Sequence, residues 1–409
     1  MQWTTARKQA ISLRYGLLAL NVFGAYAATD VLSQIREKMA GNLAQVPNYT
    51  CTETIERSEK QSPRKKFQPL DKVRLEVALV GGRELLSWPG AGKFEERDLG
   101  DFVSGGTTAS GDYALHAQTI FRTNKPTFRA AGEENLDGKR AVRFEYDVVL
   151  AKSEFLVRTG DKEARVPYHG SFWADPATLD LIRLDILVDA APRELDVARA
   201  STEIRYRQVK VGQSDFLLPR VVDLVLQRND GGDRRNRTEF ANCRQYVGES
   251  VIIFDDPDLA AGILKGPPQE IELPAGLEFE TQLTGAINFK TAVVGDPVNA
   301  RAQGAAKKDG KILIPKGAVF HGRIRQMLQH GDYALVGIEI FEVEFENKKA
   351  ALLCQLRSAG PIPGVGTRSL SLVPQTEPNG IGAMIAQTVR IGMLPNGFRM
   401  IWSTLPKSK

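Results

Sequence analysis

A short turn phrase, apolar-Pro-x-Gly, occurs three times in the C-terminal part of the chain and constrains its fold more than any other feature. The copies are Leu273-Pro274-Ala275-Gly276, Ile314-Pro315-Lys316-Gly317 and Leu394-Pro395-Asn396-Gly397. Proline at the second turn position fixes φ, and the glycine supplies the positive φ that a type II turn demands. Each turn launches a strand-like run, with no long helix between the copies. This pattern predicts a small β-barrel or sandwich over residues 271–409.

The segments around these turns fill in the predicted barrel. Strands are expected at residues 277–283, 298–302, 318–324 and 398–404, and the last should return beside the first. Residues 337–345 alternate apolar and acidic side chains, which predicts a half-exposed strand with a charged outer face. Residues 380–393 are apolar but interrupted by glycine and polar side chains. We interpret them as a loop, with an insertion that contacts a membrane as the alternative.

The order of these elements carries a resemblance. LPxG, a strand, a Gly-Asp turn, a strand, IPKG and then Gly-Arg-Ile follow one another across residues 273–356. This order resembles the C-terminal β-barrel domain of TrbI-type conjugation proteins, which contribute to the envelope-spanning channel of type IV secretion systems. The resemblance implies a barrel that contacts other envelope proteins.

Residues 1–27 have the three parts of a secretory signal peptide. Arg7, Lys8 and Arg14 form a basic region, residues 16–23 an apolar core, and Ala25-Tyr26-Ala27 a small-x-small cleavage site. An N-terminal membrane anchor or a core helix is the alternative, although the apolar run is short for a membrane span. The expected location is therefore exported, in the periplasm or associated with the outer membrane of a bacterium.

Removal of such a signal leaves a nearly neutral protein. The chain has 54 Lys+Arg and 49 Asp+Glu, so the loss of three basic residues leaves 51 against 49. The densest basic run, Arg234-Arg235-Asn236-Arg237, is short, and we interpret it as a solvated loop. Nucleic-acid binding usually needs a broader basic face, so no nucleic-acid partner is expected.

The chain contains three cysteines, Cys51, Cys243 and Cys354. In an oxidising compartment a disulfide becomes plausible, and a Cys51–Cys243 bridge would join the two ends of the first domain. Three cysteines permit three pairings, and the sequence alone does not choose between them. Cys354 lies among leucines and is expected to be buried.

Residues 28–255 predict an antiparallel β-rich domain with one or two helices. Residues 30–43 carry apolar side chains at helical spacing, and a short helix is expected near residues 112–121. Alternating strands follow, including one in which Ile182, Leu184, Ile186 and Val188 share a face. Residues 256–270, rich in aspartate and proline, form a predicted linker. The overall fold class is mainly β (α+β): a curved antiparallel sheet followed by a small barrel or sandwich.

One hairpin within this domain carries a second resemblance. The phrase GSFWADPATLDLIRLDI, which begins at Gly170, is similar to a hairpin of the LolA/LolB-like lipoprotein-carrier superfamily. That family folds as a half-open antiparallel barrel wrapped over helices, and the resemblance implies an apolar cavity for acyl chains. Trp173 lies next to the Asp-Pro turn and is our candidate for a cavity mouth, with core packing as the alternative.

Sequence motifs for catalysis are missing. The four histidines do not have zinc-hydrolase spacing, and neither a G-x-S-x-G elbow nor a glycine-rich phosphate loop occurs. The carboxylate pairs Glu133–Glu134 and Glu342–Glu344 are of the kind found on any charged β-surface. We therefore predict no enzymatic activity and assign no catalytic, cofactor-binding or metal-binding residues.

The leading hypothesis is a non-enzymatic envelope protein with a binding or scaffold role. Its first domain would offer an apolar concavity to a lipid or lipoprotein, and its second would contact other envelope proteins. Peripheral association with a membrane fits this reading. The alternatives are a structural component of a secretion or assembly complex, which would oligomerise through the C-terminal barrel, and a hydrolase of envelope polysaccharide.

Overall fold

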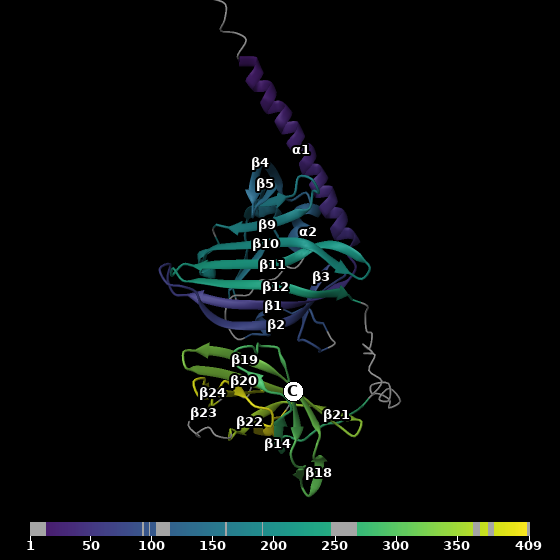
Figure 1. Ribbon diagram of the computed structural model, residues 1–409, viewed down its shortest axis with the longest axis vertical. Helices are drawn as coiled ribbons and strands as arrows, with labels where there is room; N and C mark the ends of the chain where they lie inside the picture. Colours follow the sequence, from purple (N-terminus) through teal and green to yellow (C-terminus); the bar gives the residue numbers. More distant parts are fainter. Residues whose placement is uncertain are drawn as a thin grey trace, which may run out of the picture.

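The structure, a computed structural model, describes residues 14–91, 94–97, 99–103, 115–159, 162–189, 191–246, 268–362, 369–374 and 380–406. Side chains are described from residue 29 onward, except at positions 158 and 330. Two β-sheets follow one another along the long axis of the molecule, and an N-terminal helix projects from the end that bears the first sheet (Figure 1). The predicted fold class is confirmed.

The first sheet has ten strands in the order β3-β2-β1-β12-β11-β10-β9-β8-β5-β4, and all its pairings are antiparallel. Its strands are β1 (Tyr49–Lys60), β2 (Gln68–Val80), β3 (Arg83–Ser87), β4 (Thr127–Leu136), β5 (Lys139–Val148), β8 (Tyr168–Ala174), β9 (Leu181–Val188), β10 (Val197–Val211), β11 (Ser214–Arg228) and β12 (Asp233–Gln245). A separate hairpin joins β6 (Leu156–Thr159) and β7 (Lys162–Arg165). Three 3-10 turns complete this part: η1 (Leu99–Asp101), η2 (Leu150–Lys152) and η3 (Arg193–Leu195).

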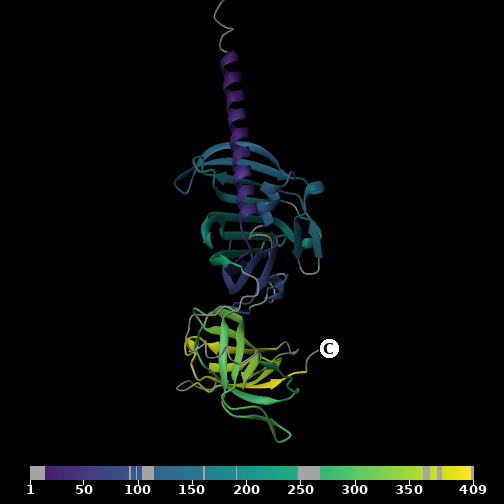
Figure 2. The same cartoon turned by 90° about the vertical axis from the view of Figure 1, so that its right-hand side faces the viewer.

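Two helices cover one face of this sheet (Figure 2). Helix α1 (Arg14–Gln45) contains the predicted amphipathic segment and begins earlier than expected, and α2 (Leu115–Arg122) is the predicted short helix. The fully buried Ile35 of α1 and Ile120 of α2 belong to the same core as the inward side chains of the sheet. Among the described residues, no helix is both long and apolar enough to cross a membrane.

Aromatic rings fill the space between the helices and the sheet. The ring of Phe172 lies 5.2 Å from Phe121 of α2, 6.2 Å from Phe128 and 5.3 Å from Phe144, measured between centroids. Tyr146 crosses Gly170, and its hydroxyl donates to the carbonyl oxygen of Asp185 at 2.7 Å. A Cβ at Gly170 would lie 1.9 Å from that oxygen, so only glycine fits beneath the tyrosine. The expected open concavity is thus occupied by the protein's own side chains.

The first sheet joins the two ends of its own sequence. Strand β1 pairs with β2 on one side and with β12, the last strand of the sheet, on the other. The pairing of β1 with β12 contains a bulge, where Asn242 adopts a positive φ of 51°. Beside the bulge, Cys51 and Cys243 form a disulfide across a sequence separation of 192 residues.

The second sheet is also ten-stranded and mixed, because β13 pairs with β21 in parallel while the other pairings are antiparallel. Its path is β13-β21-β20-β19-β16-β14-β26-β22, and β24 joins β20 to β23 off this path. The strands are β13 (Gln269–Glu270), β14 (Glu278–Leu283), β16 (Pro297–Ala302), β19 (Val319–His330), β20 (Tyr333–Phe345), β21 (Lys348–Ala351), β22 (Cys354–Ala359), β23 (Leu370–Leu372), β24 (Ile381–Gln387) and β26 (Arg399–Thr404). Two small ribbons join β15 (Ile287–Asn288) to β25 (Met393–Leu394) and β17 (Ala306–Lys308) to β18 (Lys311–Ile314).

The three repeated turns have the same conformation and make the same kind of hydrogen bond in this sheet. Their glycines Gly276, Gly317 and Gly397 have φ values of 76°, 85° and 78°, as the turn prediction requires. Each glycine N–H donates to the carbonyl oxygen that ends a neighbouring strand, namely Thr404, Ala302 and Leu283 respectively. The last strand, β26, pairs with the first long strand, β14, as predicted.

The position of proline in these turns differs from the prediction. The turn hydrogen bonds run from Ala318 N to Pro315 O and from Phe398 N to Pro395 O. In these two turns proline therefore occupies the first turn position and not the second, and glycine occupies the third.

The two sheets share one junction. The free edge of β2 continues into the second sheet, because Arg74 N donates to Val294 O at 2.8 Å and Val294 N donates to Lys72 O at 2.9 Å. The Arg74 guanidinium pairs with Asp296. Val73 and Leu75 are fully buried in the apolar core of the second sheet.

Two arginine side chains also contact an aromatic ring at the junction. The guanidinium groups of Arg323 and Arg325 lie 5.2 Å and 5.1 Å from the ring centroid of Trp88. Burial lowers the pKa of Arg323, although Glu339 raises it in opposition, and an arginine remains charged at neutral pH. The contact across the sheets therefore combines backbone bonds, an ion pair and cation–π stacking.

Four local predictions need correction. The basic run at residues 234–237 lies in strand β12 and not in a loop, where Asp223 on the adjacent strand pairs with Arg235 and Arg237. Residues 381–387, expected to be a loop, form β24. Leu181 takes the core position expected for Ile182, because β9 is irregular opposite Trp173–Ala174. The hairpin after β20 turns at Glu346–Asn347, both with positive φ, one residue earlier than predicted.

Other predictions stay open. Residues 1–13 lie outside the described residues, so the signal peptide remains a prediction. Most of the predicted linker lies outside them as well, although its last two residues form β13. The domain limits at residues 28–255 and 271–409 also stay predictions.

The disulfide should contribute strongly to stability. Closing a loop of 192 residues corresponds to about 5 kcal/mol in the chain-entropy relation. We expect a reductant to lower the free energy of unfolding of the natural chain by an amount of this order, measured by chemical denaturation. In the double variant Cys51→Ser/Cys243→Ser the reductant should have no effect. An equal effect of reductant on both proteins would contradict the bridge.

Gly295 tests the junction. It has a φ of +97°, and a Cβ there would lie 2.2 Å from the carbonyl oxygen of Arg74 and 3.2 Å from the Trp88 ring. Gly295→Ala should therefore lower the free energy of unfolding by about 1–3 kcal/mol beyond the cost of the left-handed φ. Gly276→Ala is the matched control, since Gly276 also has a positive φ but no atom within 4 Å of its Cβ position. Equal destabilisation of the two variants would show that the close approach to Arg74 is unimportant.

Candidate functional site

Three hollows in the described structure are candidates for a binding site. One of about 390 Å³ lies between α1 and the ends of β9–β11, one of about 550 Å³ lies beside α2, and one of about 730 Å³ lies between the two sheets. The side chains that line them differ in polarity and charge. This difference distinguishes the hollows that arise from packing between elements from the one that suits ligand binding.

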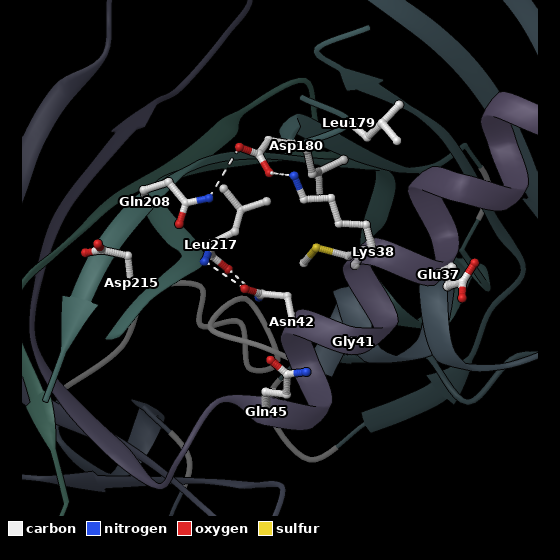
Figure 3. A pocket seen from close by; sticks show the side chains of 12 residues that line it. Glu37, Lys38, Gly41, Asn42, Gln45, Leu179, Asp180, Gln208, Asp215 and Leu217 are labelled. Carbon is white, nitrogen blue, oxygen red and sulfur yellow. Dashed lines mark hydrogen bonds and ion pairs between the residues drawn. The ribbon is translucent and has the colours of Figure 1, made fainter. Parts of the chain in front are cut away.

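The hollow beside α1 is crossed by polar contacts (Figure 3). Lys38 Nζ lies 2.7 Å from Asp180 Oδ1, and Gln208 Nε2 donates to the other oxygen of the same carboxylate at 3.3 Å. The Asn42 amide both donates to and accepts from the backbone of Leu217, at 2.9 Å each. These bonds attach the last turns of α1 to the sheet, so the residues of this hollow hold the helix in position.

The hollow between the sheets carries many cations, but carboxylates match most of them. Arg57 pairs with Asp71, Lys72 with Glu56 and Arg235 with Asp223, and Arg74 pairs with Asp296 as described above. Matched charges leave little net field to attract an anion. We interpret this hollow as a gap at the surface of the junction and not as a ligand site.

The hollow beside α2, which we call the α2 groove, has a different character. It is lined by Leu115, His116, Gln118, Thr119, Arg122, Thr123, Lys125, Glu154, Phe155, Leu156 and Tyr168. Leu115 and Leu156 remain 37 % and 54 % exposed, and Val149 and Leu150, just before this lining, are 56 % and 53 % exposed. Four large aliphatic side chains therefore face solvent on adjoining segments at one end of the first sheet.

Local structure fixes this arrangement. The loop that carries η2 is held by Ser153, whose hydroxyl donates to Val166 O at 2.6 Å and accepts from Phe155 N at 3.1 Å. His116 of α2 stacks on the Phe155 ring at 5.2 Å with an interplanar angle of 22°. The apolar side chains thus lie on a loop held by hydrogen bonds and on a helix that contacts it.

Charged groups line the rim. Arg122 ends α2 and is exposed, while Lys125 Nζ lies 2.5 Å from Glu154 Oε2. The hydrogen bond from Lys125 lowers the pKa of Glu154. Burial, with a smaller contribution from Glu154, raises the pKa of Tyr168 to about 12, so its hydroxyl stays protonated at neutral pH. The groove offers an apolar wall, cations and hydroxyl groups, which suit binding better than acid–base chemistry.

Trp173 lines none of the three hollows described above, and its place at a cavity mouth stays a prediction. Its neighbours Phe172 and Ala174 face the helix-covered core, so alternation along β8 turns Trp173 to the opposite face of the sheet. There the Arg143 and Arg183 guanidinium groups lie 5.3 Å and 4.7 Å from its ring, and its indole N–H donates to Glu134. Trp173 organises the charged outer face of the sheet.

The other candidate residues are distributed over both sheets. Cys51 and Cys243 are joined in the disulfide, and Cys354 is free and buried, where desolvation raises the pKa of its thiol to about 12. Glu133 bonds Arg140 and Glu134 bonds Trp173, so this carboxylate pair acts separately. Glu342 and Glu344 instead lie beside His321 on the second sheet.

The α2 groove could not be predicted from the sequence. An exposed leucine and a core leucine look the same in a sequence, and the apolar residues of the groove come from segments far apart in the chain. The only local signal is the presence of Val149, Leu150, Phe155 and Leu156 in a short stretch that interrupts the strand pattern.

No protein-family model matches this chain, and no curated protein matches it. The chain is similar in structure to a DUF1329 family protein from Desulfovibrio piger, with 14 % identity, a TM-score of 0.29 and coverage of 56 % of this chain and 97 % of that one. It is also similar to a putative outer membrane lipoprotein-sorting protein domain from Vibrio parahaemolyticus, with 12 % identity, a TM-score of 0.28 and coverage of 57 % and 97 %. A third similar structure is LprF from Mycobacterium bovis, with 12 % identity, a TM-score of 0.19 and coverage of 55 % and 95 %.

These similarities involve the N-terminal sheet. TM-scores of this size establish neither a shared fold nor a shared function. The comparisons give no support to the resemblance of residues 273–356 to a TrbI-type barrel.

Proposed function

We propose that the protein is a non-enzymatic binding protein of the bacterial cell envelope and that its α2 groove holds the acyl chain of an amphiphile with an anionic head group, such as a lipid or a lipidated polypeptide. The observation that carries this proposal is the exposure of Leu115 and Leu156 in the lining of one groove, with Val149 and Leu150 exposed on the loop that leads into it. Exposed apolar patches of this kind commonly mark binding sites.

The energy available from these side chains is sufficient for a ligand. Fully burying one leucine-sized side chain contributes about 1.5–3 kcal/mol. Covering the exposed parts of Leu115 and Leu156 would contribute a favourable free energy to the binding of an acyl chain. A hollow of about 550 Å³ is in the size range of small-molecule sites.

The charges at the rim favour an anionic head group. Arg122 is exposed at the end of α2, and Lys152 is exposed at the end of η2 beside the apolar side chains. Both are near the surface, so their attraction for a head group should weaken as salt is added.

The disulfide supports a location outside the cytoplasm. Structural disulfides form and persist in oxidising compartments such as the periplasm, and they are rare in the cytosol. The predicted signal peptide at residues 1–27 points to the same compartment. Both fit a protein that meets lipids or lipoproteins in the envelope.

The test is the affinity of the whole chain for a fluorescent long-chain fatty acid. Leu156→Glu removes apolar wall and adds a charge that repels the carboxylate, so we expect at least a tenfold rise in Kd, equivalent to about 1.4 kcal/mol. The matched control is Ile312→Glu, since Ile312 is a similarly exposed aliphatic side chain, at 58 %, on β18 of the second sheet. Its Kd should be unchanged. Absence of binding to the natural chain, or equal effects of both variants, would contradict the proposal.

A second candidate function rests on a different surface. On the outer face of the second sheet, Leu328, Leu335 and Ile385 lie opposite one another across β19, β20 and β24, and Tyr333 is exposed nearby. A row of aliphatic side chains on a sheet surface suits packing against another copy of the chain. This would make the protein a structural component of an envelope assembly.

Light scattering on the whole chain tests this second function. The natural chain should form a discrete oligomer at micromolar concentration, and Ile385→Lys, which places a charge in the row, should shift it to monomer. Ile312→Lys is the control for an exposed aliphatic side chain elsewhere on the second sheet. A monomeric natural chain, or an oligomer that survives Ile385→Lys, would exclude assembly through this face.

A further inference from the structure

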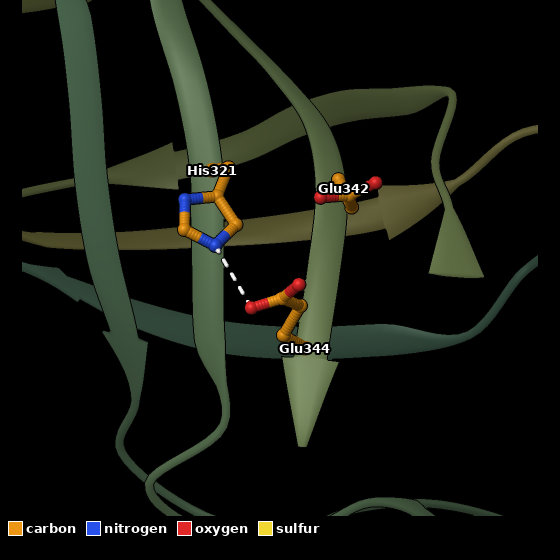
Figure 4. A group of neighbouring side chains, drawn as sticks. All are labelled: His321, Glu342 and Glu344. Atoms are coloured by element: carbon orange, nitrogen blue, oxygen red, sulfur yellow. Dashed lines mark ion pairs between the residues drawn. The ribbon is translucent and has the colours of Figure 1, made fainter. Parts of the chain in front are cut away.

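Three side chains with metal-ligating atoms meet on the second sheet (Figure 4). His321 lies on β19, and Glu342 and Glu344 lie on β20. One ligand atom from each lies within 4.8 Å of those of the other two, and His321 Nε2 is 3.5 Å from Glu344 Oε2.

Strand register produces this cluster. His321 and Glu342 are directly opposite each other in the β19–β20 pairing, and Glu344 is the next outward residue on the same strand. Side chains opposite each other across an antiparallel pair have Cβ atoms about 4.5–5.5 Å apart. The three groups are therefore held by the backbone of a rigid hairpin, and a small change of side-chain rotamer would bring their ligand atoms together.

A fourth residue orients the imidazole. Asn299 on β16 is the register partner of His321 on its other side, and its Oδ1 lies 3.2 Å from His321 Nδ1. An amide oxygen only accepts hydrogen bonds, so Nδ1 carries the proton and donates it to Asn299. The lone pair of Nε2 then points toward the two carboxylates. Metal-binding histidines almost always use their second nitrogen in this way.

Three of the neighbouring cations pair with other carboxylates. Lys349 is the register partner of Glu344, but its Nζ lies 3.3 Å from Glu270. Arg323 and Arg325 both pair with Glu339, at 3.0 Å and 3.1 Å. Two carboxylates thus lie beside one imidazole, and a divalent cation would compensate their charge.

We propose that His321, Glu342 and Glu344 bind a Zn²⁺ ion, with Asn299 holding the imidazole in place. One nitrogen and two carboxylate oxygens are ligands that Zn²⁺ accepts at about 2.0–2.2 Å, and a tetrahedral shell of this size separates ligand atoms by roughly 3.4 Å. Three protein ligands leave the fourth position open for water or for a donor group from a second molecule. The side chains of His321 and Glu344 are 34 % and 46 % exposed, so the ion can enter directly from solvent.

Isothermal titration of the tag-free whole chain with ZnCl₂, after removal of metal by a chelator, tests the proposal. We expect one ion per chain. His321→Ala and the isosteric Glu342→Gln/Glu344→Gln variant should each weaken binding more than tenfold. Asn299→Ala removes only the group that orients the ligand and should weaken binding about 10- to 100-fold.

His169→Ala is the matched control. His169 also pairs with a carboxylate, Asp189, at 2.6 Å, but on the first sheet and without a second carboxylate ligand in contact. Its Zn²⁺ affinity should equal that of the natural chain. Melting curves without metal should superimpose for all variants, since each substituted side chain is accessible to solvent. Failure of the natural chain to bind Zn²⁺, or binding that persists in His321→Ala, would overturn the proposal.

Discussion

The pairing of β1 with β12 is the constraint on which the rest of the first sheet depends. It brings together strands from the two ends of a long sequence segment, and the Cys51–Cys243 bridge fixes that pairing covalently. The closure places β1 inside the sheet, with β2 and β3 on one side of it and the strands from β12 to β4 on the other. The buried aromatic rings then fill the concave side, and α2 is left at one end with a groove beside it.

The same closure creates the junction with the second sheet. Placing β1 inside the sheet leaves part of β2 with a free edge, and exposed strand edges tend to recruit further strands. Here the edge is satisfied within the chain, by backbone bonds between residues 72–74 and Val294. Gly295 permits this close approach, and Trp88 covers it under two guanidinium groups. The two sheets are therefore coupled by directional contacts as well as by a shared apolar core.

The two proposed sites differ from the outer face of the first sheet in how their charged and apolar side chains are arranged. On the outer face of the first sheet, arginines alternate with carboxylates, as at Arg183 with Asp185 and Glu203, and the field largely cancels. The α2 groove departs from this pattern through its uncovered aliphatic side chains. The His321 cluster departs from it through two carboxylates that share an imidazole. We expect binding sites where side chains depart from this alternation of charges, because groups without a partner in the protein can contact a ligand.

Much of the fold could be predicted from the sequence because turns and alternation are local. The three Pro-x-Gly turns, the pairing of β26 with β14, the two helices and the burial of Cys354 follow from patterns of a few residues. Register could not be predicted. An irregularity in the pairing of β8 with β9 places Leu181, and not Ile182, in the core. Pairing with the neighbouring strands places residues 234–237 in a strand and not in a loop.

The sites depend on those non-local choices. The sequence by itself determined a mainly β chain with a helix at its start and turns at fixed places, since backbone conformation responds to adjacent residues. Only the tertiary structure decided which leucines stay in solvent, which face Trp173 occupies and that His321 meets Glu342 and Glu344. Each of these depends on the register between strands, and a shift of one residue would turn every side chain involved to the other face.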